Sequence, residues 1–325
     1  MPAEHLSPLL GQRLVIVTGK GGTGKTTVAA ALGVAAARAG RSVLVAEVGG
    51  AEQVPQRVVP GHPPVGYRTR ELIPGLSSIH IDPFAALAEY LGLQTHLPGI
   101  VDLVMRNKGF AQLLDAAPGW RELITLGKVW HLAQMQTPGG TPLYELIIVD
   151  APATGHGLTF LDVPRVVGTA VRAGPLRGHA HLVEELIRDP GQTLLLPIAL
   201  AEELPARETA ELVGRARDEI GVAVDRVVVN AVAQNPFPAP TPPDLDERLA
   251  RLDDDARLGG LPRPGVLAHC ARYLRARYEL NAVYTEQIRK TCEQPIVTLP
   301  YRPGELSGAD ALASLAAPLL AEPGS

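Results

Sequence analysis

The feature that most constrains this chain is a glycine-rich run, GKGGTGKT, at residues 19–26. It satisfies the pattern G-x-x-x-x-G-K-[ST], and it lies between an apolar β-rich run at residues 14–18 and a helical pattern that begins near Lys25. Glycines let the backbone curl so that successive N–H groups face phosphate oxygens, and the N-terminus of the helix adds a favourable dipole. The run therefore predicts a phosphate-binding loop within an α/β fold.

Side chains within this loop supply the remaining chemistry of a nucleotide site. Lys25 is placed to neutralise charge on the β- and γ-phosphates, and the hydroxyl of Thr26 is placed to ligate Mg²⁺. We therefore expect ATP and Mg²⁺ as cofactors. The residues expected to hold the nucleotide here are Gly19, Gly21, Gly22, Thr23, Gly24, Lys25, Thr26 and Thr27.

Apolar β-rich runs alternate with helical patterns along the chain. Most of the runs lack period-two alternation, as strands do when a parallel sheet is covered on both faces. This order predicts an α/β fold with a doubly wound, mostly parallel sheet. The predicted strands are 14–18, 42–48, 77–81, 146–149, 193–199, 226–229 and 296–299, and the clearest helices are 25–38, 207–219 and 268–289.

The chain is predicted to form one P-loop domain, residues 1–325, with a helical insertion. The insertion, residues 83–136, has several helical patterns and no strand signal, and Asp82 is expected to cap its first helix ahead of Pro83. Its apolar residues either form a groove for a hydrophobic client or pack against the sheet and one another. A second irregular stretch, Asn235 to Asp246, contains five prolines and is expected to be a surface loop or lid.

Composition excludes several classes of function. A formal charge of −4 with dispersed charges gives no electrostatic footprint for nucleic acid. Cys270 and Cys292 lack the spacing of a zinc site or a disulfide framework. No uninterrupted apolar run approaches about 18 residues, so we expect a cytoplasmic protein that reaches a membrane only through a partner.

A second motif begins at Asp150, which ends the apolar strand 146–149. A carboxylate at the end of such a strand can lie beside the Mg²⁺ shell, although strand-ending aspartates also serve as helix caps and turn residues. The continuation through residue 156 reads APATGH, and the helix that follows contains FLDVP at residues 160–164.

These blocks resemble the family of the arsenite-pump ATPase ArsA and the ATPase that guides tail-anchored proteins to membranes. The family has D-T-A-P-T-G-H before a helix with F-L-x-x-P, and this chain has the same spacing. Lys20 matches the signature lysine of the family's deviant P-loop, which reaches the nucleotide of a facing subunit. The resemblance thus implies a dimer in which Lys20, Lys25 and Asp150 are catalytic, with Thr26 and Asp150 as Mg²⁺ ligands. It also places Asn230, Pro300 and Tyr301 against adenine.

Three departures from the family pattern bear on activity. Gly49 stands where the family has the aspartate that positions the attacking water, so hydrolysis by the isolated chain is in question, and Glu47 and Glu52 are the candidate substitutes. The zinc-binding CxxC pair of the eukaryotic targeting ATPases is missing, which predicts no zinc. The metalloid-binding cysteines of ArsA also have no counterparts, which argues against arsenite transport.

The sequence therefore favours an ATPase whose nucleotide state opens and closes a dimer that acts on a protein or membrane-associated client. Lys20 without an aspartate at 49 suggests a heterodimer with a related ATPase subunit, and a homodimer is the alternative. A hydrolysis-deficient, ATP-sensing subunit is the rival function. A partitioning or division-site ATPase is disfavoured because the last predicted helix, residues 308–322, has no Lys or Arg.

Overall fold

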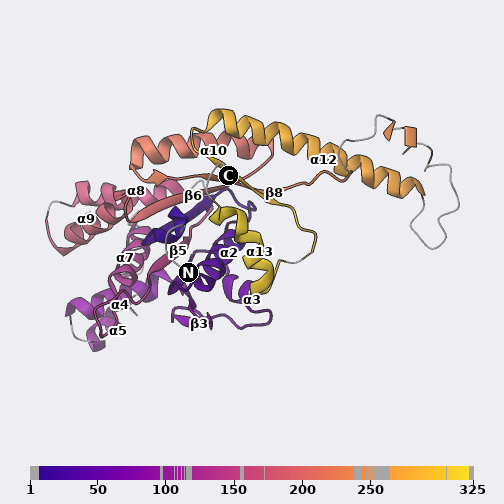
Figure 1. Ribbon diagram of the computed structural model, residues 1–325. Coiled ribbons are helices and arrows are strands. Elements are labelled where there is room, and N and C mark those ends of the chain that lie inside the picture. Colours follow the sequence, from indigo (N-terminus) through magenta and orange to yellow (C-terminus); the bar gives the residue numbers. More distant parts are fainter. Residues whose placement is uncertain are drawn as a thin grey trace.

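The fold is built on a mostly parallel β-sheet with helices on both faces (Figure 1). In the part of the chain that is described, nine strands form this sheet in the order β3-β4-β2-β5-β1-β6-β8-β9, with β7 paired to β6. The strands are β1 (Leu14–Gly19), β2 (Val43–Val48), β3 (Arg70–Ile73), β4 (Leu76–Ile81), β5 (Leu146–Asp150), β6 (Thr193–Leu200), β7 (Ala223–Val224), β8 (Val227–Val232) and β9 (Ile296–Pro300).

The computed structural model describes residues 7–95, 98–105, 107, 109–110, 112, 114, 119–153, 157–171, 173–237, 244–245, 247–248, 251, 264–304 and 306–321. Its helices are α1 (Pro8–Gly11), α2 (Lys25–Arg38), α3 (Val54–Val58), α4 (Pro83–Thr95), α5 (Pro98–Met105), α7 (Trp120–Gln134), α8 (Gly157–Ala170), α9 (Pro175–Arg188), α10 (Glu203–Arg215) with its π-helical continuation η1 (Ala216–Ile220), α12 (Pro264–Thr291) and α13 (Ala309–Leu320). Most of the proline-rich stretch Asn235–Asp246 and residues 154–156 of the second motif lie outside these ranges.

The predicted fold class is confirmed, and all seven expected strands are present to within a few residues. Two further strands were not predicted. Strand β3 is short and partly exposed, with Arg70 and Glu71 at its start, and it runs antiparallel to β4 at the edge of the sheet. Strand β7 has only two residues, so it is too short to leave a hydrophobic pattern.

Two hydrophobic clusters cover the two faces of the sheet. Alternate residues of one strand divide between them: Leu14 and Ile16 of β1 belong to the cluster with α7, α8, α9 and α10, whereas Val15 and Val17 belong to the cluster with α2, α3 and α13. This division follows from the two-residue period of a strand, and it explains why the strands are apolar throughout.

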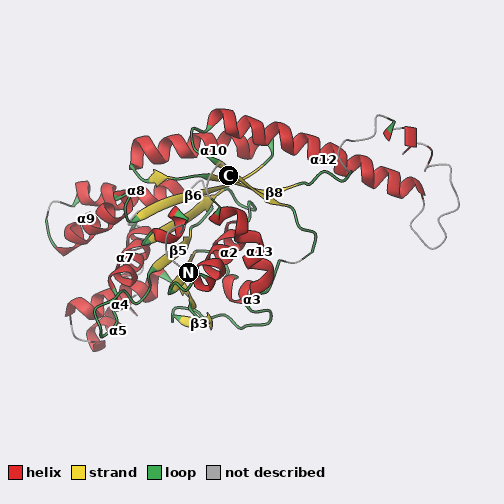
Figure 2. Cartoon of the chain, viewed as in Figure 1, coloured by secondary structure: helices red, strands yellow, loops and turns green. Residues whose placement is uncertain are grey.

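Helices α4, α5 and α7 lie between β4 and β5 in the chain, within residues 83–136, and they gather on one side of the molecule (Figures 1 and 2). The backbone N–H of Ala85 donates to Asp82 Oδ1 at 2.7 Å, which confirms the predicted cap of α4. Helix α12 extends beyond the sheet (Figure 1). No helix among the described residues has the length and apolar character needed to cross a membrane.

Candidate functional site

The glycine-rich loop joins β1 to α2 at the centre of the sheet, where β1 lies between β5 and β6. Two of its glycines are required by close approaches. A Cβ on Gly19 would lie 2.2 Å from the carbonyl oxygen of Ile198 in β6, and a Cβ on Gly24 would lie 2.3 Å from Asn230 Nδ2. Gly24 also has φ +90° at the N-cap of α2, a conformation that disfavours any side chain. Gly21 and Gly22 are exposed at the tip of the loop.

Polar side chains fix the shape of this loop from within. Thr23, which is buried, donates its hydroxyl to the carbonyl of Lys20 at 2.9 Å, and Lys25 Nζ donates to the same carbonyl at 3.0 Å. Burial lowers the pKa of Lys25, and the Asp150 carboxylate opposes that shift. Thr27 lies half-buried in the first turn of α2.

Thr26, in the first turn of α2, contacts Asp150, which ends β5, the strand beside β1. Parallel pairing of β1 with β5 sets Val17 opposite Asp150, so the carboxylate reaches the start of α2. The Thr26 hydroxyl donates to Asp150 Oδ2 at 2.6 Å. Asp150 Oδ1 is buried and has no hydrogen-bond partner among the described residues. Burial raises the pKa of Asp150, while the Thr26 hydrogen bond and the Lys25 charge lower it.

The donor set at this point fits a magnesium ion. The Thr26 hydroxyl and the Asp150 carboxylate, whose Oδ1 has no partner among the described residues, are hard oxygen ligands of the kind Mg²⁺ takes from proteins. Proteins usually supply one or two such side chains beside phosphates and water. In keeping with so small a set, no group of three or more His, Cys, Asp or Glu that could hold a metal occurs among the described residues.

Two glutamates lie near the end of β2, Glu47 within the strand and Glu52 in the loop after it, and their contacts differ. Glu52 is fully engaged in its loop, because its two carboxylate oxygens accept the backbone N–H groups of Val65 and Gly66 at 2.7 and 3.0 Å. Glu47 is paired in register with Asp150, and its Oε1 accepts the N–H groups that start α3, those of Gln53 and Val54. Its Oε2 is buried without a partner in the described part of the chain, and burial raises its pKa to about 7.

Gly49 lies beyond the end of β2 with φ +74°, and Gly50 follows with φ +67°. Among the described residues, only Pro152 Cβ, at 4.0 Å, lies near the position of a Cβ on Gly49. The backbone therefore turns through two left-handed residues where the resemblance places a water-positioning carboxylate.

Lys20 is held within its own chain. Its Nζ donates to Glu208 Oε1 of α10 at 2.5 Å, and the two side chains are 42% and 43% exposed. Exposed ion pairs of this kind stabilise by about 1 kcal/mol or less, so the contact can be exchanged for another at little cost. Sequence reasoning missed Glu208, which no motif marks.

The residues expected near adenine lie on β8 and β9. Asn230 Nδ2 donates to the carbonyl of Thr23 at 2.8 Å, which ties β8 to the phosphate loop. Ala231 then takes φ +55°, and the ladder with β9 shifts register between Val229 and Val232. Pro300 ends β9, and Tyr301 is 47% exposed with the Arg277 guanidinium 5.2 Å from its ring centre.

Asn281 of α12 is a further positioning residue that the sequence did not reveal. Its Oδ1 accepts the N–H of Ala233 at 2.8 Å, and its Nδ2 donates to the carbonyl of Ala201 at 3.0 Å. The side chain is buried and bridges the segments that follow β8 and β6. A lone asparagine within a helical pattern was the signal available.

Comparison with known proteins places these features in a wider group. The profile described as "Anion-transporting ATPase" (ArsA) matches residues 12–180. ATPase BagA of Mycobacterium tuberculosis is 34% identical over 268 residues, which cover 80% of this chain and 76% of that protein. ATPase GET3 of Lachancea thermotolerans is 24% identical over 331 residues, with 90% and 85% covered. A putative arsenical pump-driving ATPase of Halobacterium salinarum is 27% identical over 248 residues, with 70% and 37% covered.

Proposed function

Because this chain belongs to the anion-transporting ATPase (ArsA) family of ATPases, we propose that it binds MgATP at residues 19–27 and that the nucleotide state switches a dimer. The observation that carries the proposal is the contact of Thr26 with Asp150 beside Lys25, with one carboxylate oxygen left for a ligand. Thr26 and Asp150 would hold Mg²⁺, which neutralises phosphate charge when it is bound.

Other groups of the chain orient the nucleotide. Backbone N–H groups of the loop face the phosphates, and the Lys25 ammonium supplies the cation beside them. Asn230 uses its Nδ2 on Thr23, so its Oδ1 is the atom available to accept a hydrogen bond from the amino group of adenine. Pro300 and the exposed ring of Tyr301 flank the same region at the end of β9.

The partner proposal rests on Lys20. A lysine at this position serves a neighbouring subunit in the family that the sequence resembles, and in this chain it is engaged with Glu208. Dimer closure would exchange Glu208 for the phosphates of the facing site, and the helices within residues 83–136 would move with it to act on a protein or membrane-associated client.

A hydrolysis-deficient, ATP-holding subunit of a heterodimer is the second candidate. The left-handed glycines at 49 and 50 favour it, because they leave no carboxylate at the usual place. Such a chain would donate Lys20 to a related subunit that retains the aspartate. In the homodimer alternative Glu47 is the stronger substitute, since Glu52 has both oxygens engaged with backbone N–H groups.

Calorimetric titration with ATP in the presence and absence of Mg²⁺ tests the binding site. Lys25→Ala should abolish tight binding, while Lys290→Ala, an exposed lysine beside Glu286 in α12, should leave it unchanged. Equal affinity in the two variants would reject the loop as the site.

Steady-state hydrolysis separates the two candidates. Turnover by the isolated chain that is lost in Glu47→Gln and retained in Glu52→Gln supports the homodimer. Turnover that appears only with a co-purified related subunit supports the heterodimer.

A further inference from the structure

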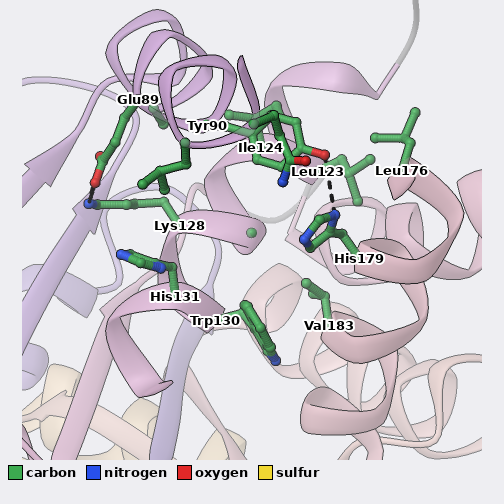
Figure 3. A pocket seen from close by; sticks show the side chains of 14 residues that line it. Glu89, Tyr90, Leu123, Ile124, Lys128, Trp130, His131, Leu176, His179 and Val183 are labelled. Atoms are coloured by element: carbon green, nitrogen blue, oxygen red, sulfur yellow. Dashed lines mark hydrogen bonds and ion pairs between the residues drawn. The ribbon is translucent and has the colours of Figure 1, made fainter. Parts of the chain in front are cut away.

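We propose that the cavity enclosed by α4, α7 and α9 is a binding site for a small, uncharged, mostly apolar molecule that carries one hydrogen-bond acceptor. The cavity lies outside the nucleotide site, and the proposal is independent of the function proposed above. Figure 3 shows side chains from the three helices converging on it. Its apolar wall is formed by Leu93, Leu123, Ile124, Trp130, Leu176 and Val183.

The size of the cavity sets the size of the ligand. Its volume is about 110 Å³. Protein interiors rarely leave voids much larger than a water molecule, and an apolar cavity of about 150 Å³ in another protein stays dry and binds benzene. One ring or a short branched chain therefore fits, whereas a long apolar helix does not. Leu93 and Leu176, which are 54% and 38% exposed, stand at the wall where solvent is reached.

Gly127, in the middle of α7, helps to keep this space open. A Cβ built on it would meet no atom of the described residues within 4 Å, and the residue lines the cavity. Glycine within a helix destabilises it by about 0.5–1 kcal/mol relative to alanine. Neither close packing nor a positive φ requires glycine at this point, so the open volume is what its missing side chain provides.

One end of the cavity offers a hydrogen-bond donor, the hydroxyl of Tyr90. His179 Nδ1 lies 2.9 Å from the carbonyl oxygen of Pro175, which can only accept, so this nitrogen carries the hydrogen. The same nitrogen lies 3.2 Å from the hydroxyl of Tyr90, which then acts as its second acceptor (Figure 3). The Tyr90 hydroxyl hydrogen is thereby left to donate to a ligand acceptor.

The opposite end holds an ion pair whose two charges compensate each other. Lys128 Nζ donates to both carboxylate oxygens of Glu89 at 2.8 and 2.7 Å, and Tyr67 donates its hydroxyl to the same carboxylate. The Lys128 and Glu89 side chains are 12% and 34% exposed, so the two charges compensate each other at the partly exposed end of the cavity. An ionic ligand would have to lose its hydration here without a counter-charge, which favours an uncharged one.

Two probes of matched shape test the site: acetophenone, which has a carbonyl acceptor, and ethylbenzene, which has a methylene in its place. The full chain is labelled with 5-fluorotryptophan and followed by ¹⁹F NMR. Trp130 lines the cavity, and Trp120, which packs edge-on against Phe84, is the internal reference. Saturable shifts of the Trp130 resonance alone are expected with both probes.

Three variants decide the outcome. Gly127→Leu should fill the cavity and lower acetophenone affinity at least tenfold, while Gly92→Leu, also open around its Cβ but in α4 and outside the cavity, should not. Tyr90→Phe should weaken acetophenone about fivefold and leave ethylbenzene unchanged, as expected for one lost hydrogen bond.

Gly127→Ala gives a weaker block if the leucine variant fails to fold. The absence of saturable binding of either probe would overturn the proposal, as would binding that is indifferent to both Gly127 substitutions. Displacement of the probes only by a long apolar helical peptide would instead assign the cavity to a protein client.

Discussion

The candidate nucleotide site at the carboxyl ends of β1 and β5 and the cavity among α4, α7 and α9 are built by different means. At the candidate nucleotide site, backbone conformation and buried polar atoms define the site, as the positive φ of Gly24 and the Asp150 oxygen without a partner among the described residues illustrate. In the cavity, apolar side chains of three helices define the site and the polar groups sit at its ends. The first arrangement suits phosphate and a metal ion, and the second suits a small apolar body.

The difference also concerns what each region does with its charges. Lys20 and Glu208 form a half-exposed pair beside the phosphate-binding loop. Breaking this pair in favour of another partner costs little free energy. Lys128 and Glu89, whose side chains are 12% and 34% exposed, form a less exposed pair beside the cavity, so solvent compensates less for the loss of one partner there. We therefore read the first pair as part of a switch and the second as a fixed wall.

The largest expected effect is on turnover, through Lys20→Ala. In the dimer, Lys20 would stabilise charge that develops at the facing site, a role worth on the order of 10³-fold or more when an arginine performs it. Steady-state ATP hydrolysis by the chain with its dimer partner should fall by about that factor, and Lys290→Ala is the matched control. Retained turnover in Lys20→Ala would show that this lysine has no catalytic role at the facing site and serves only in its ion pair with Glu208.

The next effect is on the loop, through Gly24→Ala. The added Cβ meets Asn230 Nδ2 at 2.3 Å and must adopt φ +90°, so we expect a loss of about 2–4 kcal/mol of unfolding free energy together with weaker ATP binding. Gly40→Ala has a similar φ of +86° with nothing within 4 Å of its Cβ, so it isolates the backbone strain. Urea denaturation gives the unfolding free energy of each variant. Equal losses in Gly24→Ala and Gly40→Ala would mean that the Asn230 side chain moves aside for the added Cβ at no energetic cost.

A smaller effect is expected from Asn230→Ala. The variant removes the bond to Thr23 and the acceptor proposed for adenine, and an unpaired polar edge in a protein pocket costs about 1–3 kcal/mol. ATP affinity should fall and discrimination against GTP should relax, as measured by competition calorimetry. An unchanged ATP-to-GTP preference would make Asn230 a purely structural tie between β8 and the loop.

The two regions differ in how far the sequence predicts them. Helix α2 was predicted with the bounds that the structure shows, Lys25–Arg38, and the meeting of Thr26 with Asp150 follows once β1 and β5 are parallel neighbours. The reason is that short motifs encode backbone geometry locally. By contrast, Tyr90 and His179, which are in contact, lie 89 residues apart in the chain, and no local sequence pattern predicts their contact.

The contact between Lys20 and Glu208 was beyond sequence reasoning for the same cause. Which acidic residue of α10 faces the loop depends on how that helix packs on the sheet rather than on a motif. The roles of Lys20, Lys25, Asp150 and Asn230 remain predictions that the variants above address.

The smallest effect has the opposite sign and sets the two regions directly against each other. Gly127→Ala makes the same chemical change as Gly24→Ala, but its Cβ enters open space within a regular helix. It should therefore raise the unfolding free energy by about 0.5–1 kcal/mol, measured by thermal and urea denaturation. Gly92→Ala in α4 should stabilise similarly without affecting acetophenone, because it lies outside the cavity. A destabilised Gly127→Ala would contradict the comparison, since it would show that α7 needs glycine for close packing and that the space beside it is not open to a ligand.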